Sequence, residues 1–352
     1  MRLLAGRAHE TVVVCRDRFA RERSPGDHSH LNLSNRVRVD QGVKVYALPH
    51  EVNFEKSLYY VIEQWKPDCI LIGEDPTNLS LAVAIEKSVK RIVVLALSQA
   101  TLPFGPEAFY PDPNLANLFK PPVEIVALSN YVSEYIRRWG RLDTVRLSHI
   151  LQEHLHAPHL GHFDNPFIMF VNASKIKGLP IFLKLAQQFP SARFAAVRGW
   201  ATTPSDVSEL NRHDNVTVLQ PKEDVDEIFS QARLLLVPSL WGEAFGLIAL
   251  EAMVRGIPVL ASDVGGLREA KLKVDYLLPV NPISGYDKTL DERLLPNPII
   301  PDQNVEPWCE ALRRLLYDRE RYDALSKESR TIAMKHLEGL DENQWVDYLE
   351  EK

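Results

Sequence analysis

The chain alternates between short apolar runs and longer segments in which apolar residues recur at helical spacing. The short runs are rich in β-branched residues and are typical of buried strands, and the segments between them are typical of crossover helices. In the first half this pattern predicts strands at residues 11–15, 43–47, 69–72, 92–97 and 124–128. It predicts helices at residues 54–65, 79–88 and 129–139, the last with Ser129 as its N-cap.

The same alternation restarts in the second half of the chain. It predicts strands at residues 167–171, 193–197, 216–219, 234–237 and 259–261. Strands that are apolar throughout occur in parallel sheets covered by helices on both faces. The pattern therefore predicts an α/β fold of two doubly wound, Rossmann-like domains. We expect an N-terminal domain at residues 1–155, a C-terminal domain at 156–335, and a final helix within 336–352 that crosses back to the N-terminal domain.

Two stretches interrupt the alternation. Residues 149–166 contain five histidines, namely His149, His154, His156, His159 and His162. Histidine is a common metal ligand, so a metal site is one interpretation. A solvated interdomain linker is the interpretation that the pattern favours, because no cluster of Cys, Asp or Glu with ligand spacing accompanies the histidines. Residues 279–307 are rich in proline and indicate a surface insertion.

Composition narrows the class of protein. The 352 residues carry 41 Lys and Arg against 47 Asp and Glu, and this balance argues against a dedicated nucleic-acid-binding protein. Cys15, Cys69 and Cys309 are widely spaced, which is typical of thiols in a reducing compartment, and we expect a cytoplasmic protein. The apolar runs are too short for a transmembrane helix. Basic residues between 133 and 146 are compatible with either a solvated face or a peripheral contact with an anionic membrane.

The segment from residue 234 to residue 270 carries the clearest chemistry. A buried strand ends at Val237, a loop follows, and a helix is expected to begin near Gly246 and to end before Gly256. A helix start offers free N–H groups and a positive dipole end, which suit a phosphate. Two glutamates, Glu243 and Glu251, flank that helix start. From their spacing alone, a functional role and a capping or ion-pairing role remain equally open.

This segment resembles the donor-site signature of the retaining glycosyltransferases of the GT-B fold, glycosyltransferase family four (group 1 type). The resemblance rests on an ordered set of positions: Pro238-Ser239, Glu243 and Glu251 separated by seven residues with Phe-Gly-Leu at 245–247 between them, Gly-Ile-Pro-Val at 256–259, and Asp-Val-Gly-Gly at 263–266. It implies two Rossmann-like domains that face each other across a cleft. It also implies that the domains close around their substrates.

The resemblance implies that the C-terminal domain holds a nucleotide diphosphate sugar, which is a substrate rather than a cofactor. By position, Glu243 would be the catalytic carboxylate that holds hydroxyls of the transferring sugar, and Glu251 would accept hydrogen bonds from the ribose. Lys177, which precedes Gly178, would meet the diphosphate. The remaining donor-binding positions are Ser239, Phe245, Gly246 and Leu247. No general base is assigned, because in this family the departing phosphate is thought to deprotonate the acceptor.

The chain departs from the family pattern at several positions. The loop at residues 171–178 lacks the arginine that usually precedes the lysine, with Ser174 and Lys175 as substitutes, and Arg198 and Trp200 stand where a glycine-rich turn is usual. Residues 2–15 correspond to the end of the first helix and the second strand, so the N-terminal domain is expected to lack its first strand and glycine loop. No histidine follows the strand at 92–97, and we expect the acceptor side at Ser98, Gln99 and Phe104.

Three functions remain open. The leading one is a retaining, metal-independent hexosyltransferase that moves a sugar from a nucleotide diphosphate sugar to an unknown hydroxyl acceptor. The second is a nucleotide-sugar epimerase of the same fold, which needs no acceptor. The third is a catalytically weak or inactive protein that binds nucleotide sugars or serves as a partner subunit. The missing arginine and the missing first strand motivate the third function.

Overall fold

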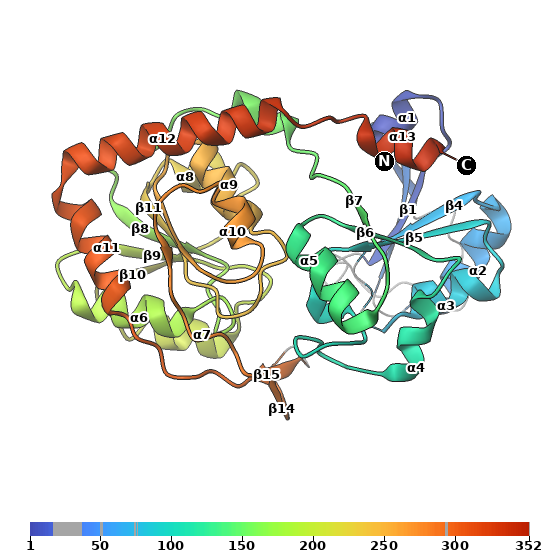
Figure 1. The fold of residues 1–352 in the computed structure, drawn as a ribbon, viewed down its shortest axis with the longest axis horizontal. Helices are drawn as coiled ribbons and strands as arrows, with labels where there is room; N and C mark the ends of the chain where they lie inside the picture. The colour runs from blue at the N-terminus through green and yellow to red at the C-terminus, as the bar shows by residue number, and fades with distance from the viewer. Residues whose placement is uncertain (17–36, 50–51, 74, 76, 293–294, 352) are drawn as a thin grey trace.

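The protein folds into two lobes that lie side by side (Figure 1). The computed structural model describes residues 1–16, 37–49, 52–73, 75, 77–292 and 295–351. We call the described part of residues 1–148 the N-terminal unit and residues 157–340 the C-terminal unit. Residues 149–156 connect them and contain the 3-10 helix η6 (Gln152–His156). Two α/β units with parallel sheets agree with the fold class that the sequence predicts.

A six-stranded parallel sheet forms the centre of the C-terminal unit. Its strands, in spatial order, are β10 (Val216–Leu219), β9 (Phe194–Val197), β8 (Phe167–Val171), β11 (Ala232–Val237), β12 (Val259–Ser262) and β13 (Leu277–Leu278). The strand order runs outward from β8 in one direction and from β11 in the other, so the order reverses between these two neighbours. In doubly wound sheets, ligands bind outside the carboxyl ends of the strands at such a switch point.

The N-terminal unit contains two sheets among its described residues. One is parallel and consists of β4 (Cys69–Ile72), β5 (Arg91–Ala96), β6 (Glu124–Ala127) and β7 (Val145–Arg146). In the other, β3 (Val43–Leu48) lies between β1 (Val12–Arg16) and β2 (Val37–Asp40), parallel to β1 and antiparallel to β2. The described part of β1 therefore has only β3 as a partner, and β4 begins a separate sheet.

Helices cover the sheets (Figure 1). In the N-terminal unit they are α1 (Arg2–Gly6), α2 (Phe54–Trp65), α3 (Leu79–Glu86), η3 (Gln99–Thr101), α4 (Pro113–Ala116), η4 (Asn117–Phe119) and α5 (Asn130–Tyr135), which the π-helix η5 (Ile136–Gly140) extends. The Ser129 hydroxyl accepts a hydrogen bond from the Val132 amide, which confirms Ser129 as an N-cap. In the C-terminal unit they are α6 (Leu179–Gln188), α7 (Pro204–Leu210), α8 (Asp226–Phe229), α9 (Leu247–Val254), α10 (Leu267–Ala270), α11 (Glu306–Tyr317) and α12 (Arg319–Glu338).

The last helix, α13 (Gln344–Glu350), lies beside the N-terminal unit rather than the C-terminal one (Figure 1). Its Trp345 and Tyr348 pack against Val93 and Val126 of the parallel sheet. The Trp345 indole N–H donates to the Ser148 carbonyl at 2.7 Å. The end of the chain is therefore fastened to the first unit by both apolar and polar contacts.

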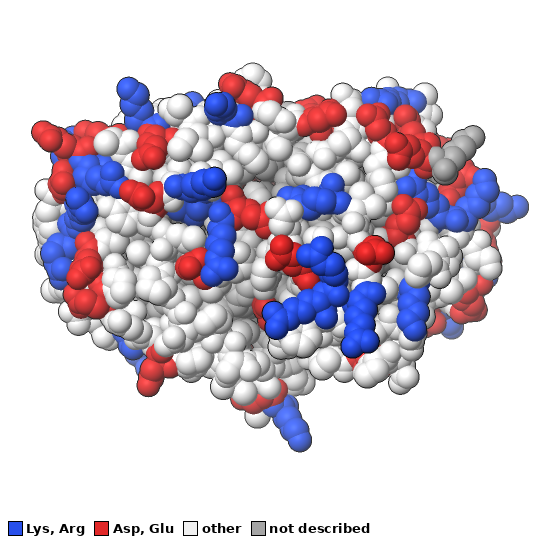
Figure 2. Space-filling model, viewed as in Figure 1, with Lys and Arg blue, Asp and Glu red and all other residues white. Residues whose placement is uncertain are grey.

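The proline-rich stretch contains a short antiparallel ribbon that the sequence pattern does not indicate. It consists of β14 (Tyr286–Leu290) and β15 (Pro296–Pro298), which project from the lower edge of the molecule in Figure 1. On the face shown in Figure 2, basic side chains gather over α5 and η5, where Arg137, Arg138 and Arg141 are exposed. Throughout the described ranges, we find no helix with the length and apolar character needed to cross a membrane.

Candidate functional site

A cavity of about 380 Å³ lies between the two units, at the switch point of the C-terminal sheet. The C-terminal unit contributes the ends of β8 and β11, the side chains of Lys177, Ser239 and Glu243, and the first residues of α9. The N-terminal unit contributes Leu97 and Leu128. Six of the seven residues predicted to serve catalysis and donor binding therefore line one cavity: Lys177, Ser239, Glu243, Phe245, Gly246 and Leu247.

Glu243 and Lys177 form an ion pair in the wall of this cavity. The Lys177 ammonium donates to both carboxylate oxygens of Glu243, at 2.7 and 2.9 Å, and the Ser239 hydroxyl donates to Oε1. Only 13% of the Lys177 side chain and 12% of the Glu243 side chain are exposed. Burial by itself would raise the pKa of Glu243, but the charge and hydrogen bonds of Lys177, together with Ser239, lower that pKa below its ordinary value. Glu243 is therefore ionised at neutral pH.

Glycines allow the backbone of this loop to pack closely. The Gly266 amide donates to the Glu243 carbonyl at 2.7 Å. Gly178, which follows Lys177, has a φ of +97°, and a Cβ there would lie 1.9 Å from the Pro238 carbonyl oxygen. Any side chain at this position would force apart the two loops that carry Lys177 and Glu243. The Lys-Gly sequence thus fixes the geometry of the ion pair.

The start of α9 faces the same cavity. Gly246 is its N-cap, with a φ of +97° and no side-chain cap, so the first N–H groups of the helix have no side-chain acceptor at the cap. Phe245, Gly246, Leu247 and Ile248 line the cavity at this end. Free N–H groups, a positive dipole end and the Lys177 ammonium together make this region suitable for an anion such as a diphosphate.

Comparison with known families identifies this part of the chain. Residues 158–275, which include the sheet end, the ion pair and α9, match the family described as glycosyl transferases group 1. This part of the chain is therefore similar to the group 1 glycosyl transferases. The matched range begins where residues 149–156 end and stops just before β13.

Curated relatives are similar to part of the chain. The D-inositol 3-phosphate glycosyltransferase of Nocardia farcinica is 48% identical over 116 residues, which are 32% of this chain and 21% of that protein. The protein of the same description from Mycobacterium avium is 31% identical over 164 residues, which are 44% of this chain and 34% of that protein. The chain thus spans about a fifth to a third of the length of these relatives.

Solved structures of glycosyltransferases share the whole fold. Sucrose-phosphate synthase from Thermosynechococcus elongatus superposes with a TM-score of 0.69 at 20% identity, covering 98% of this chain and 90% of that chain. HepE from Anabaena, solved in complex with UDP and glucose, superposes with a TM-score of 0.69 at 14% identity, covering 98% of this chain and all of that chain. At these identities the comparison establishes the GT-B fold of both units together.

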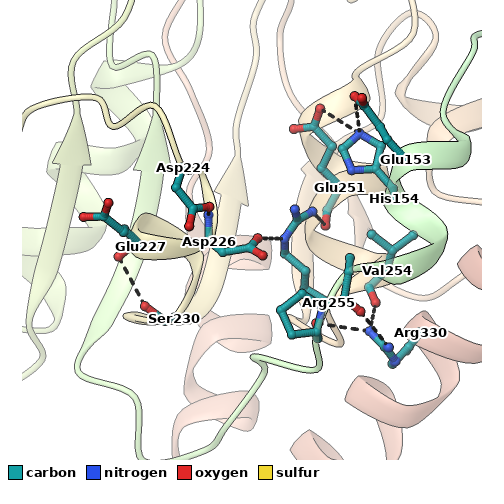
Figure 3. Close-up of polar contacts among 12 residues, drawn as sticks. Glu153, His154, Asp224, Asp226, Glu227, Ser230, Glu251, Val254, Arg255 and Arg330 are labelled. Atoms are coloured by element: carbon teal, nitrogen blue, oxygen red, sulfur yellow. Dashed lines mark hydrogen bonds and ion pairs between the residues drawn. The ribbon is translucent and has the colours of Figure 1, made fainter.

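Glu251 lies outside the main cavity. It projects from α9 toward η6, where its Oε1 is 3.8 Å from His154 Nε2, and Figure 3 shows the His154 ring between Glu251 and Glu153. Leu247 lines both the cavity and the narrow crevice that holds Glu251. Burial raises the pKa of Glu251, and the nearby His154 and Arg255 only partly oppose this. A contact with ribose remains a prediction.

One histidine of the connecting segment reaches the cavity. The His149 ring packs on Phe245 with centroids 4.6 Å apart. Burial lowers the pKa of His149 to about 4, and repulsion from Arg146 and His336 adds to this effect. Its imidazole is therefore neutral at physiological pH. His159 instead contacts Ser326 and His162. Within the described residues, no group of three or more His, Cys, Asp or Glu side chains is arranged to hold a metal ion.

The structure places the three residues expected on the acceptor side elsewhere. Ser98, Gln99 and Phe104 are buried and do not line the cavity. The Ser98 hydroxyl caps η3 by accepting from the Ala100 amide, and Phe104 packs edge-to-face on Phe119. Gln99 is fully buried and its amide bonds Glu107 and the Gly242 carbonyl. The loop after β5 turns these side chains inward, and Leu97 faces the cavity instead.

The residues that depart from the family pattern lie mostly away from the cavity lining. Lys175 is exposed and Ser174 is buried, and neither lines the cavity. Lys177 is the only lysine or arginine among the described residues that do so. Its ammonium lies 4.5 Å from the centre of the Trp241 ring and 5.8 Å from that of Trp200. Aromatic faces therefore flank the ion pair on one side and help to hold the cation.

Proposed function

We propose that the chain transfers a hexose, with retention of configuration and without a metal ion, from a nucleotide diphosphate sugar to a hydroxyl acceptor. The donor would occupy the cavity at the switch point, against the C-terminal unit. One observation carries this proposal: the Lys177–Glu243 pair and the start of α9 line the same 380 Å³ cavity. The group 1 glycosyl transferase match and the GT-B fold support the reaction class.

The leaving group is the nucleoside diphosphate, which gains negative charge as the bond to the sugar breaks. Lys177 and the N–H groups at Gly246 and Leu247 are positioned to stabilise that charge. Fixed dipoles and cations aimed at developing charge stabilise it more than water does. Catalysis here would depend on stabilising the leaving group and orienting both substrates.

Glu243 would hold hydroxyls of the transferring sugar. Its carboxylate is ionised and kept in place by Lys177 and Ser239, so it can accept hydrogen bonds without changing its position. When a diphosphate binds Lys177, the ammonium would be shared between the carboxylate and the phosphate oxygens. We assign no general base, and the acceptor proton would pass to the departing diphosphate.

His149 would supply a further polar contact beside Phe245. A neutral imidazole has one donor and one acceptor nitrogen, both of which suit a sugar hydroxyl. Leu97 and Leu128, which also line the cavity, offer no polar side-chain atoms. The curated relatives are named for D-inositol 3-phosphate, and this compound belongs first in a screen of hydroxyl acceptors.

A thermal-shift panel tests the donor assignment. We would measure the unfolding temperature with UDP-glucose, UDP-N-acetylglucosamine, GDP-mannose and ADP-glucose, each with and without EDTA. A ligand at about 100 times its dissociation constant stabilises a protein by about 2.7 kcal/mol. At least one nucleotide sugar should raise the unfolding temperature, equally with EDTA, while free glucose should not. A panel without any shift would contradict the proposal.

Replacing Glu251 by alanine should weaken binding of the donor nucleotide. Loss of one hydrogen-bonding carboxylate corresponds to about 1.5–3 kcal/mol, or roughly 10- to 100-fold in the dissociation constant. The matched control is Glu153→Ala, because Glu153 also contacts His154 but 82% of its side chain is exposed. Calorimetric titration with the nucleoside diphosphate measures both variants. Equal affinities for Glu251→Ala and wild type would remove the ribose assignment.

A nucleotide-sugar-binding protein without turnover is the second candidate. It is favoured by the scarcity of positive charge at the site, where Lys177 is the only described lysine or arginine and is already paired with Glu243. Such a protein would shift its unfolding temperature with a nucleotide sugar but would release no nucleoside diphosphate with any acceptor. An epimerase would convert the donor alone into a second nucleotide sugar.

A further inference from the structure

The N-terminal unit reaches across the cleft through one carboxylate. Glu107 lies between η3 and α4, and its Oε2 accepts from the Gly242 amide at 2.9 Å and from the Gln99 side-chain amide at 2.8 Å. Its Oε1 accepts from the Tyr131 hydroxyl. Gly242 belongs to the C-terminal unit and immediately precedes Glu243. The carboxylate therefore ties three segments of the N-terminal unit to the loop that carries the proposed catalytic residue.

The backbone of Gly242 is held at both its N–H and its carbonyl oxygen. Glu107 accepts from its N–H, and the Gln99 side-chain amide donates to its carbonyl oxygen. A Cβ at residue 242 would lie 2.0 Å from the Tyr131 hydroxyl oxygen and 2.6 Å from Glu107 Oε2. Only glycine permits this approach. Burial and the charge of Glu107 raise the pKa of Tyr131, so its hydroxyl stays protonated as a donor.

The backbone of the next residue, Glu243, is held by its own unit. The Gly266 amide donates to the Glu243 carbonyl at 2.7 Å, and a Cβ at Gly265 would lie 2.6 Å from the Glu243 backbone nitrogen and oxygen. The backbone at residues 242 and 243 is therefore held both by Gly266 of its own unit and by Glu107 of the N-terminal unit.

We propose that Glu107 is a positioning residue that couples closure of the two units to the orientation of the Glu243 loop. This inference rests on the proposed function of Glu243. When the two units are in contact, Glu107 and Gln99 hold the N–H and the carbonyl of Gly242. The Glu243 side chain then points at Lys177. When the units separate, the Gly242 backbone loses its hydrogen bonds to Glu107 and Gln99, and the loop at residues 238–246 is free to reorient.

A second carboxylate between the units provides a matched control. Glu269 of α10 accepts from the backbone amides of Asn130 and Tyr131, both at 2.9 Å, at the start of α5. It joins the C-terminal unit to the N-terminal unit as Glu107 does. Its side chain contacts Asn130, Tyr131 and Arg146, all in the N-terminal unit. Loss of Glu269 therefore removes a contact between the units without removing a bond to the loop at residues 238–246.

The test compares Glu107→Ala, Glu107→Gln and Glu269→Ala in the full chain. Hydrogen–deuterium exchange of peptides covering residues 238–246 should be faster in Glu107→Ala and unchanged in Glu269→Ala. For hydrolysis of a panel nucleotide sugar, Glu107→Ala should lower kcat about 10- to 100-fold, as misplaced groups do, with KM within about threefold of wild type. Glu107→Gln should recover part of kcat, because its amide oxygen still accepts from Gly242.

Wild-type exchange of the loop in Glu107→Ala would overturn the inference, and so would equal effects of Glu107→Ala and Glu269→Ala on that loop. A rise in KM without a fall in kcat would likewise count against a positioning role. If wild-type protein cleaves no nucleotide sugar, the proposed function fails. The exchange comparison still decides whether Glu107 holds the loop, so the two failures are distinguishable.

Discussion

Replacing Glu243 by alanine should reduce turnover of the donor by about 100- to 1000-fold, because a preorganised group at the reacting sugar is lost. The same change should lower the free energy of unfolding by about 3 kcal/mol. It leaves the Lys177 ammonium, whose side chain is 13% exposed, without its carboxylate partner. Steady-state kinetics and urea unfolding of the same preparation measure the two effects.

A double variant separates these two effects. Lys177→Met combined with Glu243→Leu replaces the buried ion pair by apolar side chains and should regain most of the lost stability. It should regain none of the activity, since both proposed roles are absent. If the double variant recovered turnover, neither residue would have its assigned role. If Glu243→Ala were as stable as wild type, the pair would not contribute to the fold.

Replacing Lys271 by methionine should stabilise the protein most strongly near neutral pH. Lys271 is only 1% exposed, donates to the Val259 carbonyl at 2.7 Å, and has its pKa lowered by burial from 10.5 to about 7. Between pH 7 and 10.5 the unfolded chain therefore binds more protons at this residue than the folded chain does. The contribution of Lys271 to the unfolding free energy rises with pH across this window.

The stability gained by Lys271→Met should consequently be on the order of 4 kcal/mol at or below pH 7 and should vanish near pH 10.5. Urea unfolding of wild type and variant at several pH values gives the difference between their unfolding free energies. Titrating groups that both proteins share contribute equally and cancel in this difference. Lys273→Met, at an exposed lysine two positions away, should change stability little at any pH. A difference independent of pH would show that Lys271 stays charged in the folded protein.

Most elements of the fold could be predicted because their strands are rich in apolar and β-branched residues. The strands β4, β8 and β10 have the predicted bounds, and α9 begins within one or two residues of the predicted start. The hydrophobic pattern does not predict strands β2 and β14, because their mostly exposed residues form no apolar run. Such strands are specified by their partners in space rather than by their own pattern.

The candidate site could be predicted only where one unit forms it. Lys177, Glu243 and the start of α9 follow two neighbouring strands of one sheet, so their order along the chain already places them together. Glu107 and His149 come from outside that sheet and approach only when the units pack. The three residues expected on the acceptor side were chosen from a loop position, and the sequence does not determine that Gln99 turns inward.

The most direct test of the account is the anomer released when wild-type protein hydrolyses an α-linked nucleotide sugar. With UDP-glucose, or the panel sugar that binds, the C1–oxygen bond breaks, water replaces the nucleoside diphosphate, and the proton passes to the diphosphate. Proton NMR recorded before mutarotation should show the α anomer, and Glu243→Ala should release far less sugar. Initial release of the β anomer, or no release of nucleoside diphosphate with water or any hydroxyl acceptor, would contradict a retaining glycosyltransferase.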